Sequence, residues 1–230
     1  MTRVKICGIR TAEDAHAAIE AGADAIGLLV GRLHASPDFI EPQLARAIVA
    51  EMPPFVSTVL VTHLADANSI SALVDTVRPS TLQLHGESKI GDAAALRSSY
   101  PHLKIYKALH ANRKAVQERV DLWSTHVDAI LLDTSAPETD QVGGTGRTHN
   151  WAISATIAKT ALKPVILAGG LNPSNVALAI AKVRPYAVDV NSGTKNASGY
   201  KDHAKMRQFI ETAHNWDRHI EDIAAQRAIV

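Results

Sequence analysis

An acidic residue that ends a buried strand is the first candidate for chemistry in this sequence. The apolar run 129–132 stops at Asp133, and Gly144 and Gly146 follow in a loop that leads into a helix near Trp151. α/β enzymes place an acid beside a phosphate in this way, because the strand presents a carboxylate at its carboxyl end and the glycine loop opens a helix N-terminus to an anion. This stretch therefore predicts an acid next to a phosphate-binding loop.

A single thiol is the second candidate. Cys7 ends the short strand 3–7 and is the only cysteine of the chain, which excludes an intramolecular disulfide and a cysteine-based zinc cluster. A thiolate serves as a general base and a protonated carboxyl group as a general acid, so Cys7 and Asp133 can form a base–acid pair on either side of a small sugar phosphate. Two plainer interpretations stay open, namely Cys7 as a small buried hydrophobic residue and Asp133 as a loop cap.

The elements that position these residues alternate along the chain. Apolar runs predict strands, and segments with capping residues and helical spacing predict helices. The predicted strands are 3–7, 25–30, 55–61, 81–84, 104–109, 127–132, 164–167 and 187–190. The predicted helices are 11–19, 43–51, 67–77, 90–99, 112–122, 151–160, 173–183 and 201–213. These units predict an α/β protein with a single-domain (β/α)8 TIM barrel over residues 1–214, and a helical tail 215–230 packed on the barrel or on a partner subunit.

Small residues gather at the ends of the last three predicted strands. Glycine lets backbone N–H groups approach an anion closely, and the helix N-termini that follow add partial positive charge. The alternative is that these glycines only form tight turns. The candidate phosphate-binding residues are Gly144, Gly146, Gly169, Gly170, Asn191, Ser192 and Gly193.

Other polar residues fall at or near strand ends, where a barrel places its active site. Those assigned to substrate binding are Lys5, Arg32, Gln83, His85 and Asp189. His63 and His110 also lie near strand ends, and His63 and His85 can in principle share a metal. The sequence contains neither an HxH nor an HExxH pair, however, so hydrogen-bonding or packing roles are favoured and no metal site is predicted.

The composition excludes several classes of protein. Lys plus Arg is 24 against 23 for Asp plus Glu, and no block of like charge stands out, so electrostatics gives no case for nucleic acid. No apolar run has the length of roughly 18 residues that a membrane helix needs, and the charged N-terminus does not match a signal peptide. We therefore expect a cytoplasmic protein that acts on a small molecule, as a monomer or a homodimer.

Several segments together resemble one known family. They read VKICGIRTAEDAHAAIEAGADAIGLLV, LQLHGE, LLDT followed by GGTGRTHNW, ILAGGLNPSNVALAI, and VDVNSG followed by GYKD, and they cover residues 3–213 in order. As a set they are similar to the phosphoribosylanthranilate isomerases of the tryptophan pathway. The resemblance implies an aldose–ketose isomerase that converts N-(5-phosphoribosyl)anthranilate to an aminoketose by an Amadori rearrangement. It also implies Cys7 as the general base, Asp133 as the general acid, and no cofactor.

The chain departs from this family on the side of the aromatic amine. The family has an arginine that engages the anthranilate carboxylate, and in the corresponding run, ASPDFI, Asp38 stands in its place. Two carboxylates that face each other repel, and Arg32 is the expected compensation. Two alternatives therefore stay open: a divergent isomerase for another N-phosphoribosyl amine or phosphosugar, and a non-catalytic phosphosugar-binding barrel. Cys7 and Asp133 argue against the binding protein, because it has no need of such a pair.

Overall fold

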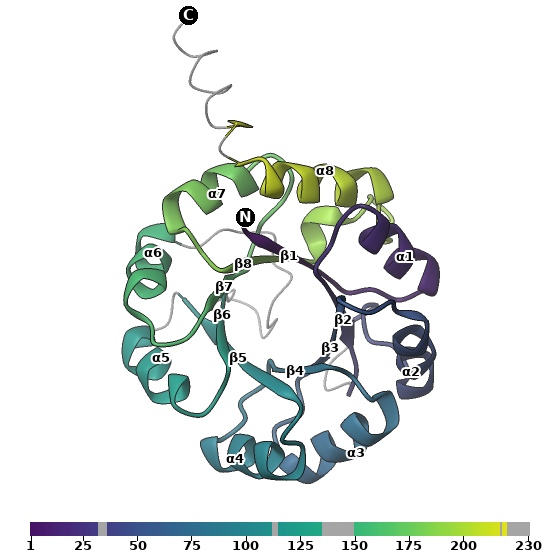
Figure 1. Cartoon of the computed structure of the whole chain (residues 1–230), viewed down its shortest axis with the longest axis vertical. Coiled ribbons are helices and arrows are strands. Elements are labelled where there is room, and N and C mark those ends of the chain that lie inside the picture. The colour runs from purple at the N-terminus through teal and green to yellow at the C-terminus, as the bar shows by residue number, and fades with distance from the viewer. Residues whose placement is uncertain (32–35, 112–114, 135–149, 217, 220–230) are drawn as a thin grey trace, which may run out of the picture.

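The computed structural model describes residues 1–31, 36–111, 115–134, 150–216 and 218–219. Its strands form a closed parallel barrel in sequence order, in which β1 pairs with both β2 and β8, and helices surround the ring (Figure 1). The (β/α)8 barrel predicted from the sequence is therefore confirmed. The strands are β1 Arg3–Cys7, β2 Ala25–Leu29, β3 Ser57–Thr62, β4 Thr81–Leu84, β5 Lys104–His110, β6 Ala129–Asp133, β7 Val165–Leu167 and β8 Ala187–Val190.

A helix follows each strand and covers the outside of the barrel (Figure 1). No helix within the described residues is long and apolar enough to cross a membrane. The α-helices are α1 Ala12–Glu20, α2 Pro42–Glu51, α3 Ala67–Val77, α4 Ile90–Ser99, α5 Val116–Ser124, α6 Trp151–Thr160, α7 Val176–Val183 and α8 His203–His214, and a short 3-10 helix, η1 Ser192–Thr194, precedes α8.

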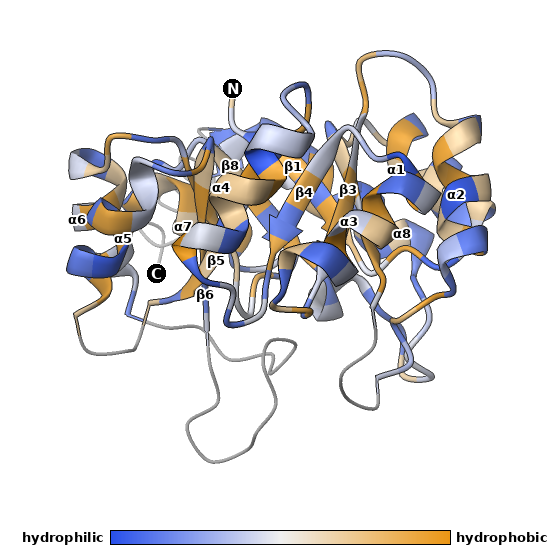
Figure 2. Cartoon of the chain, turned by 90° about the horizontal axis from the view of Figure 1, so that it is seen from below, coloured by the Kyte–Doolittle hydropathy of each residue, from blue (hydrophilic) through white to orange (hydrophobic). Residues whose placement is uncertain are grey.

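The strands read as continuous apolar runs because both of their faces are buried. Figure 2 shows largely apolar strands between the helices. One set of side chains packs between strands and helices, and a second set, which includes Cys7, Tyr106 and Leu131, fills the barrel interior. Polar residues share this interior, since Lys5 on β1 lies beside Asp189 on β8 in the strand register. The interior is thus the place where the fold holds buried charge.

Several predicted elements begin later in the structure, among them the predicted strand 127–132, which begins at Ala129, and the predicted helix 201–213, which begins at His203. Two further shifts have a local cause. The predicted strand 55–61 begins only at Ser57, because Phe55 has a φ of 71° and its side chain is fully exposed. The predicted helix 173–183 begins at Val176, because the side chain of Asn172 accepts hydrogen bonds from the backbone N–H and the hydroxyl of Ser174 and holds a turn.

Two further predictions fall partly outside the described residues. Helix α5 begins at Val116, and residues 112–114 of the predicted helix 112–122 are not described. In the predicted tail 215–230, Trp216 packs against the hydrophobic core, whereas residues 217 and 220–230 are not described. The packing of the tail as a whole stays a prediction.

Replacing Gly27 by alanine tests how tightly the barrel interior is packed. Gly27 pairs with Cys7 in the strand register, and an added Cβ would sit 2.8 Å from Cys7 Sγ and 2.9 Å from Lys5 Cε. Since overpacking a buried site forces side chains off their preferred rotamers, we expect Gly27→Ala to lower the free energy of unfolding by about 1–3 kcal/mol. Urea unfolding of the variant and the wild type measures the difference.

Gly91→Ala is the matched control for this substitution. Nothing lies within 4 Å of a Cβ at Gly91, which is in the first turn of α4. Helix propensity then predicts unchanged or slightly higher stability. Equal unfolding midpoints for Gly27→Ala and the wild type would contradict the tight packing.

Candidate active site

The thiol and the acid selected from the sequence line one cavity at the carboxyl ends of the strands. Cys7 is the last residue of β1 and Asp133 is the last residue of β6, and β7 and β8 lie between them in the ring. Both side chains border a cavity of about 250 Å³, and both residues are more than nine-tenths buried. Asp133 is the last residue of β6, one position beyond the end of the predicted strand 127–132.

A buried ion pair lies below Cys7 in the barrel interior. Lys5 Nζ donates to Asp189 Oδ2 at 2.9 Å and to Gln83 Oε1 at 3.0 Å, and the Tyr106 hydroxyl donates to the same Gln83 oxygen at 3.0 Å. Burial alone lowers the pKa of Lys5, but the carboxylate of Asp189 and the adjacent Cys7 more than offset it, so this pKa stands well above its ordinary value. Lys5 is therefore a permanent cation.

The same glutamine connects this ion pair to the acid. Because Gln83 Oε1 accepts from Lys5 and Tyr106, its amide nitrogen faces His85 and donates to Nδ1 at 2.8 Å. This assignment leaves the proton of the imidazole on Nε2, which lies 3.8 Å from Asp133 Oδ2. Burial and the neighbouring His63 and His110 lower the pKa of His85 well below its ordinary value, so its contact with Asp133 is made by a neutral ring and is not an ion pair.

Asp133 has the properties of an acid that keeps its proton until the pH approaches neutral. Burial raises the pKa of the carboxyl group to about 7, although the backbone N–H of Thr134, which donates to Oδ1 at 2.6 Å, favours the ionised form. A general acid works best when its pKa lies near the pH at which it operates.

Several neighbouring groups act on the pKa of the Cys7 thiol in opposite directions. Burial raises its pKa, Lys5 lowers it, Asp189 raises it, and Lys201 lowers it, with the net result that the pKa stands above its ordinary value. The thiolate is thus the minor form at neutral pH, and its amount depends on the two lysines.

Glycine turns bring the ends of the last three strands into close contact. Gly169 has a φ of 83°, and a Cβ there would lie 2.2 Å from the hydroxyl oxygen of Thr134, beyond β6. A Cβ on Gly193, beyond β8, would lie 1.9 Å from the carbonyl oxygen of Leu171, beyond β7. These two glycines therefore form tight turns, because only glycine lets the backbones approach so closely.

The turns also leave backbone donors at the cavity. Within the part of the chain that the structure describes, the N–H groups of Gly170, Ser192 and Gly193 donate to no protein oxygen. Gly170 and Ser192 line the cavity, and Ser192 opens the helix η1. Such a cluster of free N–H groups is suited to an anion.

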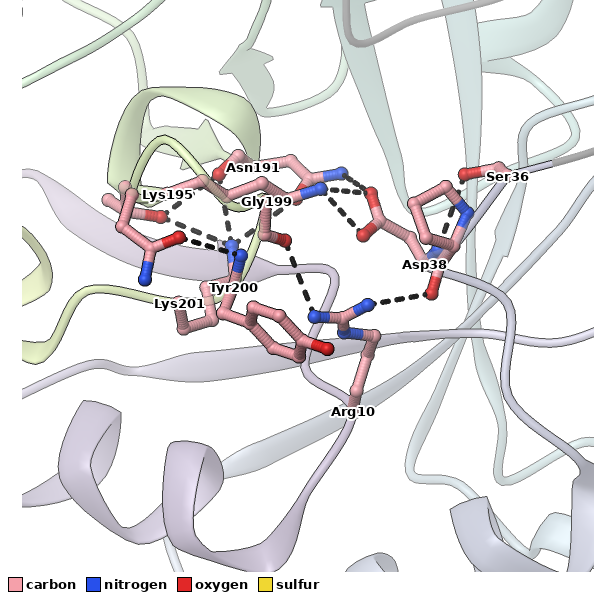
Figure 3. A network of polar contacts seen from close by, with 11 residues as sticks. Arg10, Ser36, Asp38, Asn191, Lys195, Gly199, Tyr200 and Lys201 are labelled. Atoms are coloured by element: carbon pink, nitrogen blue, oxygen red, sulfur yellow. Dashed lines mark hydrogen bonds and ion pairs between the residues drawn. The ribbon is translucent and has the colours of Figure 1, made fainter.

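Asp38, which stands where the related family has an arginine, is paired rather than exposed. Both of its carboxylate oxygens accept from Lys195 Nζ at 2.6 Å, and Oδ2 also accepts from Asn191 Nδ2 at 2.9 Å (Figure 3). Asp38 is buried, and together with Lys195 it lines the cavity. The expected compensation by Arg32 lies outside the described residues, and the partner that the structure shows is Lys195.

The predicted site residues fall into three groups. Two of them lie close to the cavity without lining it. Lys5 is bonded to Asp189, which lines the cavity, and Gly193 packs against Leu171, which also lines it. Arg32, Gly144 and Gly146 lie outside the described residues. Those that line the cavity are Cys7, Gln83, His85, Asp133, Gly169, Gly170, Asp189, Asn191 and Ser192.

His63 and His110, the other two histidines predicted near strand ends, pack in or near the cavity wall. His63 stacks on His85 with 4.6 Å between ring centroids and meets Phe39 edge-on at 5.5 Å. His110 is buried at the end of β5. Among the described residues no group of three or more His, Cys, Asp or Glu side chains is placed to hold a metal.

Two lysines near the cavity were not assigned from the sequence. Lys195 follows η1 and Lys201 lies in the GYKD segment, and an isolated antiparallel bridge joins them. The rule that the loops after barrel strands carry function points to this segment. It does not single out these residues, because the chain has 24 lysines and arginines.

Comparison with known proteins identifies the family. Residues 4–212 match the family described as N-(5'phosphoribosyl)anthranilate (PRA) isomerase. A relative from Methanosarcina mazei, named N-(5'-phosphoribosyl)anthranilate isomerase 2, is 46% identical over 213 residues, which cover 93% of this chain and 94% of the relative.

Solved structures agree. The phosphoribosylanthranilate isomerase of Thermotoga maritima superposes with a TM-score of 0.82 at 37% identity, over 93% of this chain and 99% of that one. A structure of such an isomerase in complex with reduced 1-(o-carboxyphenylamino)-1-deoxyribulose 5-phosphate has a TM-score of 0.79 at 34% identity, again over 93% and 99% of the two chains. The resemblance seen in the sequence is confirmed, and the chain belongs to the N-(5'-phosphoribosyl)anthranilate isomerase family.

Proposed function

We propose that this protein catalyses the Amadori rearrangement of N-(5'-phosphoribosyl)anthranilate in tryptophan biosynthesis. The observation that carries the proposal is the pair Cys7 and Asp133, which border one cavity from strands β1 and β6, where burial raises the pKa of Asp133 to about 7. The family match and the relatives that bear this enzyme's name support the same activity. They lend no support to the divergent isomerase or to the non-catalytic binding barrel.

The rearrangement needs one acid and one base but no redox partner. Asp133 protonates the ring oxygen of the ribose, the C1–O bond breaks, and the nitrogen lone pair forms a Schiff base with C1. The Cys7 thiolate then removes the proton from C2, and the electron pair of that C–H bond moves to give an enolamine. Tautomerisation yields the ketone, so the product is an isomer of the substrate and no cofactor is required.

The backbone donors around Gly170, Ser192 and Gly193 are the proposed phosphate site. Their free N–H groups and the start of η1 supply hydrogen bonds and partial positive charge. Gly144 and Gly146 remain predicted members of this site. Asn191 contributes differently, since its side chain is engaged by Asp38 and Lys201 and supports the loop.

The rest of the substrate meets polar groups of the cavity wall. Asp189 Oδ1 is a buried oxygen without a hydrogen-bond partner among the described residues, and a ribose hydroxyl is the proposed donor to it. Lys195 is the proposed partner of the aromatic carboxylate, because it lines the cavity and Asp38 holds it in place. Arg32 remains a predicted contact on the same side.

Location and assembly complete the proposal. A biosynthetic enzyme of this kind is expected in the cytoplasm, as a monomer or a homodimer. One related structure is of monomers derived from the dimeric phosphoribosylanthranilate isomerase of Thermotoga maritima.

Turnover by the purified protein tests the function. We expect conversion of N-(5'-phosphoribosyl)anthranilate, followed by the loss of its anthranilate fluorescence, and growth of a tryptophan auxotroph that lacks this isomerase. Cys7→Ala and Asp133→Ala should each lower kcat by about a hundredfold or more, because each removes a proton-transfer group. Both variants should still bind the reduced product analogue with nearly unchanged affinity. Undiminished turnover by both would overturn the assignment of base and acid.

The pH dependence of kcat/KM follows from the order of the two pKa values. The active form needs a thiolate and a protonated carboxyl group, yet the pKa of Cys7 is raised and that of Asp133 is about 7. Below about pH 7 the thiolate fraction rises about tenfold per pH unit while Asp133 stays protonated. Above about pH 7 the protonated fraction of Asp133 falls by the same factor by which the thiolate fraction rises. The amount of active enzyme is therefore constant until the pH passes the pKa of Cys7.

We therefore expect kcat/KM to rise up to about pH 7, to stay level, and to fall above the pKa of Cys7. Initial rates at low substrate concentration in a series of buffers of constant ionic strength measure the profile. A steep fall that begins at pH 7 would show that the thiol ionises below the carboxyl group.

The same acid should reduce stability as the pH rises. The pKa of Asp133 is raised on folding, so its favourable contribution is complete below the pKa of the unfolded chain and is lost as the pH rises to about 7. Asp133→Asn avoids this loss and should raise the free energy of unfolding at pH 8 by up to about 4 kcal/mol, with little effect at pH 4.

Urea unfolding at both pH values measures this difference. Glu41→Gln is the control, because Glu41 is exposed and its side chain makes no capping bond, and its substitution should change neither value. A stabilisation by Asp133→Asn that is equal at pH 4 and pH 8 would contradict a titration effect.

A further inference from the structure

Lys201 is a buried ammonium group to which the proposed reaction assigns no role. Its Nζ donates to the Asn191 carbonyl oxygen at 3.0 Å, to Asn191 Oδ1 at 3.2 Å and to Thr194 Oγ1 at 3.1 Å (Figure 3). Its three acceptors within the described residues are thus neutral oxygens. A buried cation normally has a charged partner. The unfavourable free energy of burying this ammonium group without one must therefore be offset by another interaction.

The charges around it are paired with one another. Lys5 is bonded to Asp189 and Lys195 is bonded to Asp38, so each of these two pairs is close to neutral as a whole. Lys201 is the remaining charge of the group, and its field is not cancelled by a bonded carboxylate.

The geometry places this field beside the thiol. Gly8 follows Cys7, and its φ of 73° brings the Asn191 side chain so close that a Cβ on Gly8 would lie 2.3 Å from Asn191 Oδ1. This is the oxygen to which Lys201 donates. Two contacts therefore connect the ammonium group to the backbone of the residue next to Cys7.

We propose that Lys201 is a positioning residue for the base: its uncompensated charge stabilises the Cys7 thiolate, and its hydrogen bonds fix the loop 191–194 against Gly8. The charged and titratable groups that act on the thiol are Lys5 and Asp189, Lys201, and Tyr106 next to Lys5. Because the charge of Lys5 is balanced by its ion pair with Asp189, Lys201 supplies the net positive field that a thiolate needs.

The charge is present at the pH where the enzyme is expected to work. Burial lowers the pKa of Lys201 to about 8, and the nearby thiol opposes this by favouring the ammonium form. Lys201 keeps its proton throughout, because the proton removed from C2 passes to the Cys7 sulfur. This inference rests on the proposed function, because that reaction uses the Cys7 thiolate as its base. Its test, however, requires no substrate.

Alkylation of the single cysteine gives that test. Because Cys7 is the only cysteine of the chain, the rate of its reaction with iodoacetamide as a function of pH reports the titration of this thiol alone. The charge of Lys201 acts on the thiol below about pH 8, where the lysine is still protonated. We therefore expect Lys201→Met to slow alkylation at pH 7.5 by about tenfold or more. Lys201→Arg should restore or exceed the wild-type rate at this pH, since a guanidinium group keeps its charge.

Lys159→Met is the matched control, because Lys159 is exposed in the last turn of α6 and removing it changes the net charge by the same amount. It should leave the alkylation rate at pH 7.5 unchanged. A Lys201→Met thiol that is alkylated as fast as in the wild type would overturn the proposal, even if its KM rises through a loosened phosphate loop. If Lys201→Met does not fold, slower alkylation of folded Lys201→Arg at pH 7.5 overturns it instead. If the variants show the expected rates but the wild-type protein has no isomerase activity, only the proposed function is refuted.

Discussion

The ion pair between Lys5 and Asp189 is the constraint around which the interior of this barrel is built. A buried ion pair is tolerated only where its geometry is good and its other hydrogen bonds are made. Gln83 and Tyr106 provide those bonds, and Gly27 leaves the space that the lysine and the neighbouring thiol occupy. The pair thereby fixes the surroundings of Cys7 and, through Gln83 and His85, those of Asp133.

Burial acts on the acid and the base in unequal ways. It raises the pKa of Asp133 to about 7, which helps a general acid, and it raises the pKa of Cys7, which hinders a general base. The site offsets the second effect with nearby cations, whereas the ionised form of Asp133 is favoured mainly by one backbone N–H group. The positive charge of the cavity therefore lies on the side of β1 and β8, next to the base.

Asp38 illustrates how a departure from the family is accommodated. Taken alone, a carboxylate at this position predicts repulsion of an anthranilate carboxylate. In the folded protein both of its oxygens are bonded to Lys195, so the pair carries no net charge and places an ammonium group on the cavity wall. The two residues are 157 positions apart, and only the closure of the barrel between β1 and β8 brings their loops together.

The sequence alone determined the barrel, the order of its elements, and the positions of Cys7 and Asp133 at strand ends, because alternating apolar runs and capping residues are local signals. It could not place the start of β3, where the left-handed conformation of Phe55 depends on the folded context. It also could not reveal the partners of Asp38 or the burial of Lys201, because hydrogen bonds between distant loops leave no pattern of spacing. The tertiary structure decided which charges cancel and which remain, since burial and pairing are properties of the folded chain.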